Sequence, residues 1–169
     1  MVTIRPLMLQ DASAVYAAVD SSRPEMARWM VWYVPTYSPA DANEWVRRSC
    51  AQHEAQTDFH FAICADADDL IGVVSLVDVD PGKATATLGY WVATPATGRG
   101  AATTAIRQVL AWASAHTLIR CIWALIAPDN RASRRVAEAN GLRLAPASSQ
   151  PANPQQLRYE IELVPSSAA

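Results

Sequence analysis

Residues 97–102, with the sequence TGRGAA, form a loop of small residues between an apolar segment and an alanine-rich one. A glycine loop that opens a helix points several backbone N–H groups in one direction, at the positive end of the helix dipole. That arrangement binds phosphate groups. Gly98 and Gly100 have no side chain, so a ligand can approach the backbone closely there. A tight strand–helix connection without a ligand is the alternative, because a single glycine motif is a weak signal.

The residues around this loop argue against two kinds of phosphate ligand. A Walker P-loop needs GxxxxGK followed by serine or threonine, and no such run is present. A dinucleotide fingerprint needs a third glycine, but Thr103 stands in its place. It also needs an acidic residue about 20 positions further on, where residues 118–121 read LIRC.

Hydrophobic periodicity predicts a series of strands and helices, with the strands in one sheet of mixed direction. Turn signals at 66–69 and 80–83 separate three consecutive strands, which indicates an antiparallel meander. Ser38, Pro39 and Asp41 have the types and spacing of a helix start, and Gly141 is typical of a left-handed C-cap. The predicted strands are 2–5, 59–65, 70–79, 84–93, 119–126 and 157–163, and the predicted helices are 10–19, 24–29, 38–54, 100–116 and 130–140.

The composition is that of a globular protein. Of 169 residues, 51% are hydrophobic and 18% charged, and no apolar run approaches the roughly 18 residues of a membrane span. The net charge of −2, without a lysine- or arginine-rich run, argues against a nucleic-acid partner. The first residues lack a signal-peptide pattern, and Cys50, Cys64 and Cys121 have no CxxC spacing. We therefore expect a cytoplasmic protein with buried, unpaired thiols and no membrane partner.

Six segments in a fixed order carry a resemblance to a known family. Besides the loop at 97–102, with Thr97 in place of the usual glutamine or arginine, they are 4–7 (IRPL), 28–32 (RWMVW), 70–74 (LIGVV), 88–92 (LGYWV) and 130–142, which opens with NRAS and ends with GL. The chain resembles the GNAT superfamily of acetyl-CoA-dependent N-acetyltransferases over about residues 2–163. Within it, the chain is similar to the RimJ/RimL type, which acetylates protein N-termini or related amines.

This resemblance implies a GNAT fold of the α/β class. Such a fold has a mixed, mostly antiparallel central sheet of six to seven strands, splayed in the middle and flanked by four to five helices. We expect a single domain over residues 1–169, with a frayed tail at 164–169. Acetyl-CoA is the implied cofactor, and no metal is expected.

The resemblance assigns the parts of acetyl-CoA to parts of the chain. The pantetheine arm is expected along a splayed strand edge, where an extended diamide can pair like an added strand. The pyrophosphate is expected on the glycine loop, and Arg135 is favoured over its neighbours Arg131 and Arg134 as partner of the 3′-phosphate. The implied cofactor-binding residues are Trp91, Val92, Ala93, Thr97, Gly98, Arg99, Gly100, Ala101, Ala102, Thr103, Asn130 and Arg135.

The resemblance also implies direct transfer from the thioester to an amine. A backbone N–H near Val92 is expected to stabilise the oxyanion. Many members use a tyrosine seven residues after the motif asparagine as acid, but Ala137 stands there. RimJ/RimL-type sequences place a serine three residues after that asparagine, which makes Ser133 the expected proton donor. A helix-start contact for Ser133 and helix capping by Asn130 are the alternatives.

The sequence leaves the general base open. Glu160 is the candidate base that we place with Ser133 among the expected catalytic residues. Asp78, Glu25 and His60 are the other candidates, and ordered water could relay the proton. An α-amino group, with a pKa of roughly 7.7–8.0, needs only a weak base, whereas a lysine near roughly 10.4 needs a stronger one.

The acceptor side is predicted from aromatic residues. Trp29, Trp32 and Tyr33, together with Asp78, are expected at the acceptor entrance, with plain helix packing as the alternative for the aromatic rings. The leading hypothesis is an N-acetyltransferase acting on a primary amine, either a protein N-terminus or a small molecule. A non-catalytic acyl-CoA-binding module of the same fold is the alternative. Either a monomer or a homodimer is compatible with the sequence.

Overall fold

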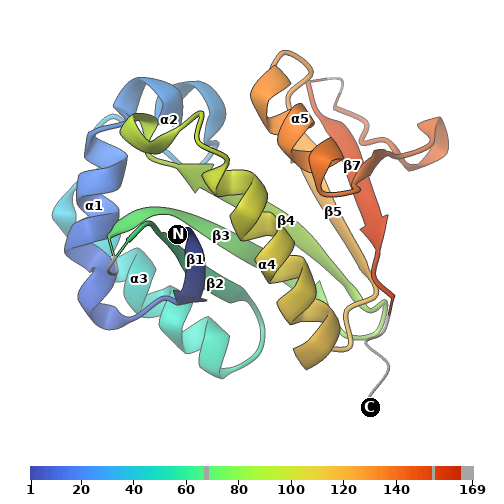
Figure 1. The fold of residues 1–169 in the computed structure, drawn as a ribbon, viewed down its shortest axis with the longest axis horizontal. Coiled ribbons are helices and arrows are strands. Elements are labelled where there is room, and N and C mark those ends of the chain that lie inside the picture. The colour runs from blue at the N-terminus through green and yellow to red at the C-terminus, as the bar shows by residue number, and fades with distance from the viewer. Residues whose placement is uncertain (67–68, 154, 165–169) are drawn as a thin grey trace.

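The computed structural model describes residues 1–66, 69–153 and 155–164. In this part of the chain, seven strands form one sheet and five α-helices cover its faces (Figure 1). The strands are β1 (Thr3–Pro6), β2 (Phe59–Cys64), β3 (Leu70–Asp80), β4 (Thr85–Val92), β5 (Cys121–Ile126), β6 (Arg143–Leu144) and β7 (Leu157–Glu162). The helices are α1 (Ala12–Asp20), α2 (Arg23–Trp29), α3 (Pro39–Glu54), α4 (Ala101–His116) and α5 (Arg131–Ala139), with short 3-10 turns η1 (Leu9–Asp11), η2 (Thr94–Ala96) and η3 (Ala147–Ser149).

The strand order in the sheet is β1-β2-β3-β4-β5-β7-β6. Every neighbouring pair is antiparallel except β4 and β5, which run parallel. The predicted meander forms β2, β3 and β4. The expected α/β fold with a mixed, mostly antiparallel sheet of six to seven strands and four to five helices is therefore confirmed.

Side-chain alternation along the strands separates two apolar cores. On one face, Leu88 of β4 packs in a core with Ile106 of α4 and Ala137 of α5. On the other face, Val15 of α1 and Val46 of α3 belong to a second core. Figure 1 shows α4 lying across the first of these faces. Full burial of one such aliphatic side chain contributes roughly 1.5–3 kcal/mol, so both cores hold their helices firmly against the sheet.

Strands β4 and β5 separate part-way along their length. They pair only between Thr85–Thr87 and Cys121–Trp123. Beyond these residues, β4 continues against β3 as far as Val92, and β5 continues against β7 as far as Ile126. Each strand then presents a backbone edge that its former neighbour no longer pairs with. The expected splay in the middle of the sheet is confirmed.

Capping residues set where the helices begin and end. The Asp41 N–H donates to Ser38 Oγ at 3.4 Å, and the Ser38 N–H donates to the Asp41 carboxylate at 2.8 Å. This reciprocal pair is the predicted capping box of α3. Helix α5 ends ahead of Gly141, whose φ of 84° is the left-handed conformation predicted there.

A few segments differ from the predicted elements. The sequence does not predict β6, because a strand of two residues carries no measurable periodicity. The predicted turn at 66–69 lies partly outside the described residues, as do residues 165–169 of the predicted tail. Among the helices that the structure describes, none has the length and apolar character that a membrane crossing requires.

Candidate active site

A cleft of about 630 Å³ reaches the opening between β4 and β5. At one end it is lined by the separating strands and the start of α5, including Tyr90 and Ser133. At the other end it is lined by the α2–α3 loop, by α3 and by the sheet face beneath them, including Trp32 and His60. The cleft therefore connects the predicted cofactor side with the predicted acceptor side.

The glycine loop follows β4 and leads into α4. Gly98 and Gly100 have φ values of 75° and 77°, and a Cβ added at either would meet no atom within 4 Å. In the described chain, no backbone carbonyl accepts from the N–H groups of residues 98–100, and Thr104 is the first helical donor, 3.0 Å from the Gly100 carbonyl. The amides of residues 98–103 therefore remain available to an anion at the positive end of α4.

Thr97 belongs to the anchored part of this loop. Its N–H and its Oγ1 both donate to the Thr94 carbonyl, at 3.2 and 2.8 Å. The Thr94 N–H in turn donates to the buried Ser22 hydroxyl at 2.8 Å, and Thr94 Oγ1 donates to the Glu25 carboxylate at 3.1 Å. The Thr97 amide is thus used within the protein, contrary to expectation. The Glu25 carboxylate anchors the loop.

The free edge of β4 offers the amides that the pantetheine arm was expected to meet. The Ala93 N–H donates to the Ile71 carbonyl at 2.7 Å, so Ala93 points towards β3. Successive backbone N–H groups of a strand point to opposite sides. Tyr90 and Val92 therefore direct their amides into the opening. Trp91 instead pairs across from Val73, and its side chain lies in the core beneath α1 and α3.

Ser133 and Asn130 lie together at the start of α5, and both line the cleft. The Ser133 N–H donates to Asn130 Oδ1 at 3.0 Å, so Asn130 caps the helix. The Tyr90 hydroxyl lies 2.5 Å from Ser133 Oγ and 3.0 Å from the Ser133 carbonyl, to which it can donate. A side chain from β4 thus reaches across the opening to α5.

Tyr90 is the residue of this end of the cleft that the sequence analysis missed. Burial raises the pKa of Tyr90 to about 12, although its hydrogen bond with Ser133 acts in the opposite direction. The phenol therefore stays protonated and can hydrogen-bond Ser133 throughout the neutral range. Strand alternation carries a signal for it, since Leu88, Tyr90 and Val92 share the face on which α5 packs.

At the acceptor end, two of the three predicted aromatic residues line the cleft. Trp29 and Trp32 do so, whereas Tyr33 is absent from the described lining. The Tyr33 ring packs edge-on against Trp32 with 6.4 Å between ring centroids. Trp32 also packs against Trp91, at 6.4 Å, so the predicted acceptor entrance touches the strand that forms the opening.

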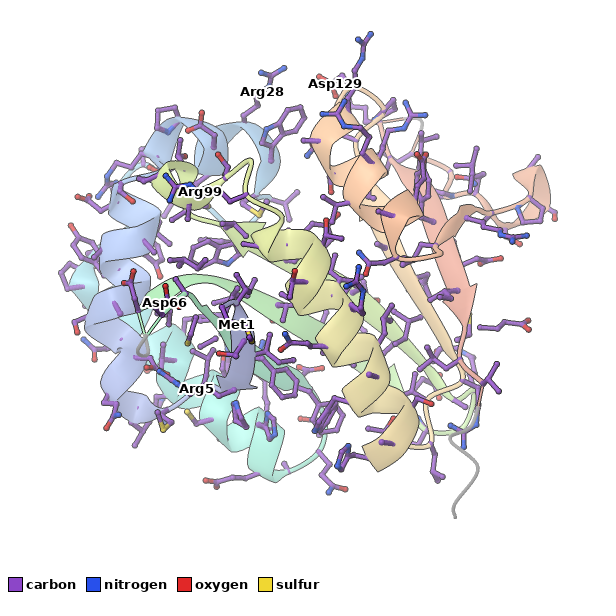
Figure 2. All side chains as sticks on the ribbon, in the orientation of Figure 1. Met1, Arg5, Arg28, Asp66, Arg99 and Asp129 are labelled. Atoms are coloured by element: carbon purple, nitrogen blue, oxygen red, sulfur yellow. The ribbon has the colours of Figure 1, made fainter. Side chains whose placement is uncertain are left out.

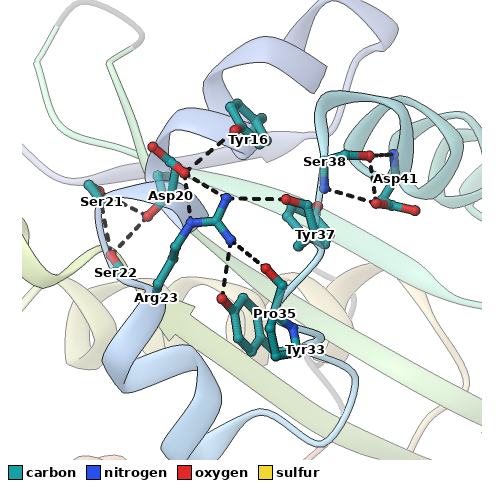
Figure 3. A network of polar contacts seen from close by, with 11 residues as sticks. Tyr16, Asp20, Ser21, Ser22, Arg23, Tyr33, Pro35, Tyr37, Ser38 and Asp41 are labelled. Atoms are coloured by element: carbon teal, nitrogen blue, oxygen red, sulfur yellow. Dashed lines mark hydrogen bonds and ion pairs between the residues drawn. The ribbon is translucent and has the colours of Figure 1, made fainter.

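Arg23 holds the loop that carries these aromatic residues (Figure 3). Its guanidinium donates to the Tyr33 hydroxyl at 3.3 Å, to the Pro35 carbonyl at 3.1 Å and to the Tyr37 carbonyl at 3.2 Å. It also pairs with Asp20 at 2.7 Å. The apolar tip of the loop is thereby fixed at the cleft.

An ion pair links the two sides of the cleft (Figure 2). Arg28 of α2 lies 3.7 Å from Asp129 in the β5–α5 connection. Their chain neighbours Trp29 and Asn130 both line the cleft. Because both charged side chains are exposed, the pair contributes at most about 1 kcal/mol.

The two predicted carboxylates do not reach the cleft. Glu160 lies opposite Trp123, where β4 and β5 are still paired, and its carboxylate accepts from Arg158 Nε at 3.0 Å. Asp78 is exposed at an irregularity of β3, with a φ of 52°, and its N–H donates to the Asp58 carboxylate at 2.9 Å. Neither is among the described residues that line the cleft. The strand register, which the sequence pattern does not specify, places both elsewhere.

The arginines of α5 divide into one that is engaged and two that are exposed. Arg134 donates to the Tyr159 hydroxyl at 3.0 Å and to the Pro128 carbonyl at 3.1 Å, so it holds α5 against β7. Arg131 and Arg135 are exposed. Arg99 is exposed on the glycine loop (Figure 2). The preference for Arg135 over Arg134 as a phosphate partner fits this arrangement.

His60 lies at the acceptor end and is only 5% exposed. Its Nδ1 is 2.9 Å from Ser75 Oγ. Burial, with the nearby His53 and Arg48, lowers the pKa of His60 to about 4. The ring is therefore neutral at pH 7 and is a weak base, so it serves as a hydrogen-bonding group.

Acidification is expected to destabilise the protein through His60. The unfolded ring has an ordinary pKa near 6.5, so between pH 6.5 and pH 4 the unfolded chain binds more protons than the folded one. The contribution is complete above pH 6.5 and falls by up to ~3 kcal/mol as the pH drops to 4. Urea unfolding at pH 7 and pH 4.5 measures it. We expect His60→Gln to flatten this dependence and the exposed His116→Gln to leave it unchanged.

The cysteines offer no activated nucleophile. Cys50, Cys64 and Cys121 form no disulfide, and Cys64 is buried while the other two are half-buried. Burial raises the pKa of Cys50 and of Cys121, which keeps both as thiols. Within the described residues, no three His, Cys, Asp or Glu side chains gather in a way that could hold a metal ion.

Comparisons with known proteins identify the family. Residues 1–143 match the family described as acetyltransferase (GNAT) domain. The "Probable N-acetyltransferase YjcK" of Bacillus subtilis (strain 168) is 29% identical over 144 residues, which cover 82% of this chain and 78% of the relative.

Solved structures share the fold at lower identity. A RimL ribosomal L7/L12 alpha-N-protein acetyltransferase in complex with coenzyme A superposes with a TM-score of 0.86 at 18% identity, over 96% of this chain and 94% of the other. Mycobacterium smegmatis RimJ in complex with CoA-disulfide superposes with a TM-score of 0.83 at 22% identity, over 95% and 81%. With the matched family covering most of its length, the chain belongs to the GNAT family of acetyltransferases.

Proposed function

We propose that this acetyltransferase transfers the acetyl group of acetyl-CoA to the α-amine of a protein N-terminus. The part of the proposal that concerns acetyl-CoA rests on the opening between β4 and β5, where two sets of backbone N–H groups remain available to a ligand. The amides of residues 98–103 suit a diphosphate, and those of Tyr90 and Val92 suit an extended diamide. The related RimL and RimJ structures hold coenzyme A or its disulfide, which supports the same ligand here.

The chain supplies positioned hydrogen bonds for the transfer. Acetyl-CoA provides an activated thioester. The Val92 N–H faces the opening and donates to the carbonyl oxygen as negative charge develops on it. The amine nitrogen bonds to the acetyl carbon and the carbon–sulfur bond breaks. The Ser133 hydroxyl, whose Oγ lies 2.5 Å from the Tyr90 hydroxyl, donates a proton to the departing sulfur, so coenzyme A leaves as a thiol. The proton that the nitrogen loses as the amide forms returns to Ser133 through water and restores its hydroxyl.

The state of the cleft carboxylates favours an α-amine over a lysine. Among the described residues, Asp41 and Glu44 are the carboxylates that line the cleft. Asp41 accepts from Ser38, and Glu44 pairs with Arg47 at 2.7 Å. Without an unpaired carboxylate as base, the acceptor must lose its proton to water. An α-amine, with its pKa of roughly 7.7–8.0, does so far more readily near neutral pH.

A thiol-release assay tests this function. With acetyl-CoA, peptides that carry a free N-terminus are expected to release coenzyme A thiol faster than Nα-acetylated peptides containing an internal lysine. Faster release with the lysine peptides would contradict the α-amine proposal and would indicate that side-chain amines are the acceptors. A thermal shift with acetyl-CoA but no thiol release on any peptide or small amine would favour the acyl-CoA-binding module instead.

The proposal includes the setting of the enzyme. Reduced thiols persist in a reducing compartment, and the three cysteines, none of which forms a disulfide, suit the cytoplasm. Size-exclusion chromatography with light scattering separates the monomer from the homodimer.

A further inference from the structure

A row of three residues crosses the sheet beneath the acceptor end of the cleft. His60 of β2 is the register partner of Ser75 of β3, and Ser75 is the register partner of Gly89 of β4. All three line the cleft, and we call them the cross-strand row. Gly89 directly precedes Tyr90, and a Cβ added to Gly89 would meet no atom within 4 Å. The row therefore leads from the opening, through free space, to the ring of His60.

Arg48 of α3 lies at the far end of this row. Burial, with the nearby charges of His53 and Arg48, lowers the pKa of His60, so the Arg48 guanidinium is within electrostatic reach of the ring. Trp45, three residues before Arg48, packs edge-on against His60 with 5.6 Å between ring centroids. Residues three apart on a helix lie on the same face. Helix α3 therefore presents a cation to the part of the cleft that contains His60, and Arg48 is among the lining residues.

The other two charged residues of the described cleft lining are carboxylates that have partners of their own. Asp41 accepts from Ser38 in the first turn of α3, where the helix dipole favours a negative charge. Both carboxylate oxygens of Glu44 accept from Arg47, at 2.7 and 2.8 Å. Arg47 also lowers the pKa of Glu44 more than Arg48 does. Arg48 itself makes no hydrogen bond or ion pair to a described residue, so its charge remains available to a ligand.

Buried hydrogen-bonding groups without partners lie beside this cation. His60 Nε2 and Thr87 Oγ1, both in the cleft lining, make no hydrogen bond to described atoms, and His60 is only 5% exposed. His60 Nδ1 is 2.9 Å from Ser75 Oγ. When Ser75 donates to Nδ1, the proton of the neutral ring is on Nε2, which can then donate to a ligand. A guanidinium, a ring N–H and a hydroxyl are together donors that suit a carboxylate, which only accepts.

We propose that Arg48, with His60 and Thr87, binds a carboxylate of the acceptor at a distance of two strand spacings from the amine that is acetylated. This inference rests on the proposed function and narrows its substrate class. Neighbouring strands are about 4.8 Å apart, so His60 lies about 10 Å from Gly89. An extended residue advances about 3.5 Å. The side chain of a glutamate or aspartate at the second position of the acceptor therefore reaches the site, whereas the side chain of the first residue is too short. The terminal carboxylate of a dipeptide is a second source of the same group.

Two matched substrate pairs test the selection. One pair is two C-terminally amidated peptides that begin with alanine and differ only in glutamate or glutamine at the second residue. The other is alanylglycine and alanylglycinamide. In the wild-type enzyme, kcat/KM is expected to be roughly tenfold higher for the carboxylate member, because hydrogen bonds to an ionised acceptor are the stronger ones. Selection in the peptide pair alone identifies a protein side chain as the source, and selection in both pairs extends the class to short free peptides.

Charge variants assign the selection to Arg48. Arg48→Gln is expected to lower the ratio to about one by slowing the glutamate peptide and leaving the glutamine peptide unchanged. Arg48→Glu is expected to reverse the preference, so that a peptide with lysine at the second residue reacts faster than the glutamate peptide. Arg107→Gln is the matched control, because it removes the same charge from an exposed position on α4, outside the described cleft lining. Thermal unfolding checks that each variant is folded.

The outcomes separate this inference from the proposed function. Equal kcat/KM values for both members of each pair in the wild type would overturn the carboxylate site and leave acetyl transfer to an α-amine intact. A preference that survives Arg48→Gln, or that Arg107→Gln lowers equally, would also overturn it. Thiol release with none of the four substrates, from an enzyme that binds acetyl-CoA, would instead overturn the proposed function on which the inference rests.

Discussion

Replacing Gly100 with alanine is expected to raise the KM for acetyl-CoA by roughly fiftyfold while leaving the protein folded. A residue with a Cβ is disfavoured at φ 77°, so the loop either changes conformation or keeps it with a loss of stability. A shift misaligns the amides of residues 98–103, and each hydrogen bond to a charged acceptor contributes about 1.5–3 kcal/mol, equivalent to a factor of about 10–150. Isothermal titration with acetyl-CoA and steady-state kinetics measure the loss.

Gly141→Ala is the matched control for backbone strain. Gly141 has a φ of 84° at the end of α5, and an added Cβ would meet only Ile161 Cδ1, at 3.4 Å. Both variants therefore lose comparable stability in urea unfolding, but only Gly100→Ala should lose affinity for acetyl-CoA. Equal KM values for the two variants would show that residues 98–103 do not hold the diphosphate.

Features set by neighbouring residues were predictable from the sequence. The capping box of Ser38 and Asp41, the C-cap at Gly141 and the glycine loop each depend on side chains or conformations within a few residues of each other. The α/β class follows from patterns of similarly short range. The opening between β4 and β5 was reached only through the family resemblance, because no local pattern states where two distant strands stop pairing.

Features set by the register between distant strands were not predictable. Tyr90 meets Ser133, and His60 meets Ser75, only because segments 43 and 15 residues apart are brought into contact. The sequence makes Glu160 a candidate base on an alternating strand. The pairing with Trp123 nevertheless places its side chain beside Arg158 and outside the cleft. Shifting a register by one residue moves every side chain to the other face, so periodicity alone cannot make these assignments.

The two sides of the cleft use different parts of the chain. In the proposed site, backbone groups of β4 and of residues 98–103 face the donor, and any residue but proline supplies such groups. Side chains from β2, β3 and β4 line the side on which the acceptor is expected. Variation among those side chains can change the acceptor while the donor site stays the same.

Ser133→Ala is expected to lower kcat by about a hundredfold with little change in the KM for acetyl-CoA. Losing a positioned general acid costs a factor of about 100 or more, and this loss falls on the transition state because the thiolate forms only there. Tyr90→Phe keeps the ring and removes the hydroxyl that lies 2.5 Å from Ser133 Oγ. We expect it to lower kcat by about tenfold, since an unheld serine samples other rotamers.

The double variant decides whether Tyr90 acts through Ser133. If it does, Tyr90→Phe has no further effect once Ser133 is alanine, so the double variant matches Ser133→Ala alone. Effects that multiply would mean that Tyr90 contributes independently, and a Ser133→Ala enzyme with unchanged kcat across the pH range would contradict the acid role. Tyr159→Phe is the control: this buried tyrosine bonds Arg134 and Glu138 away from the cleft, so it should change stability and leave kcat unaltered.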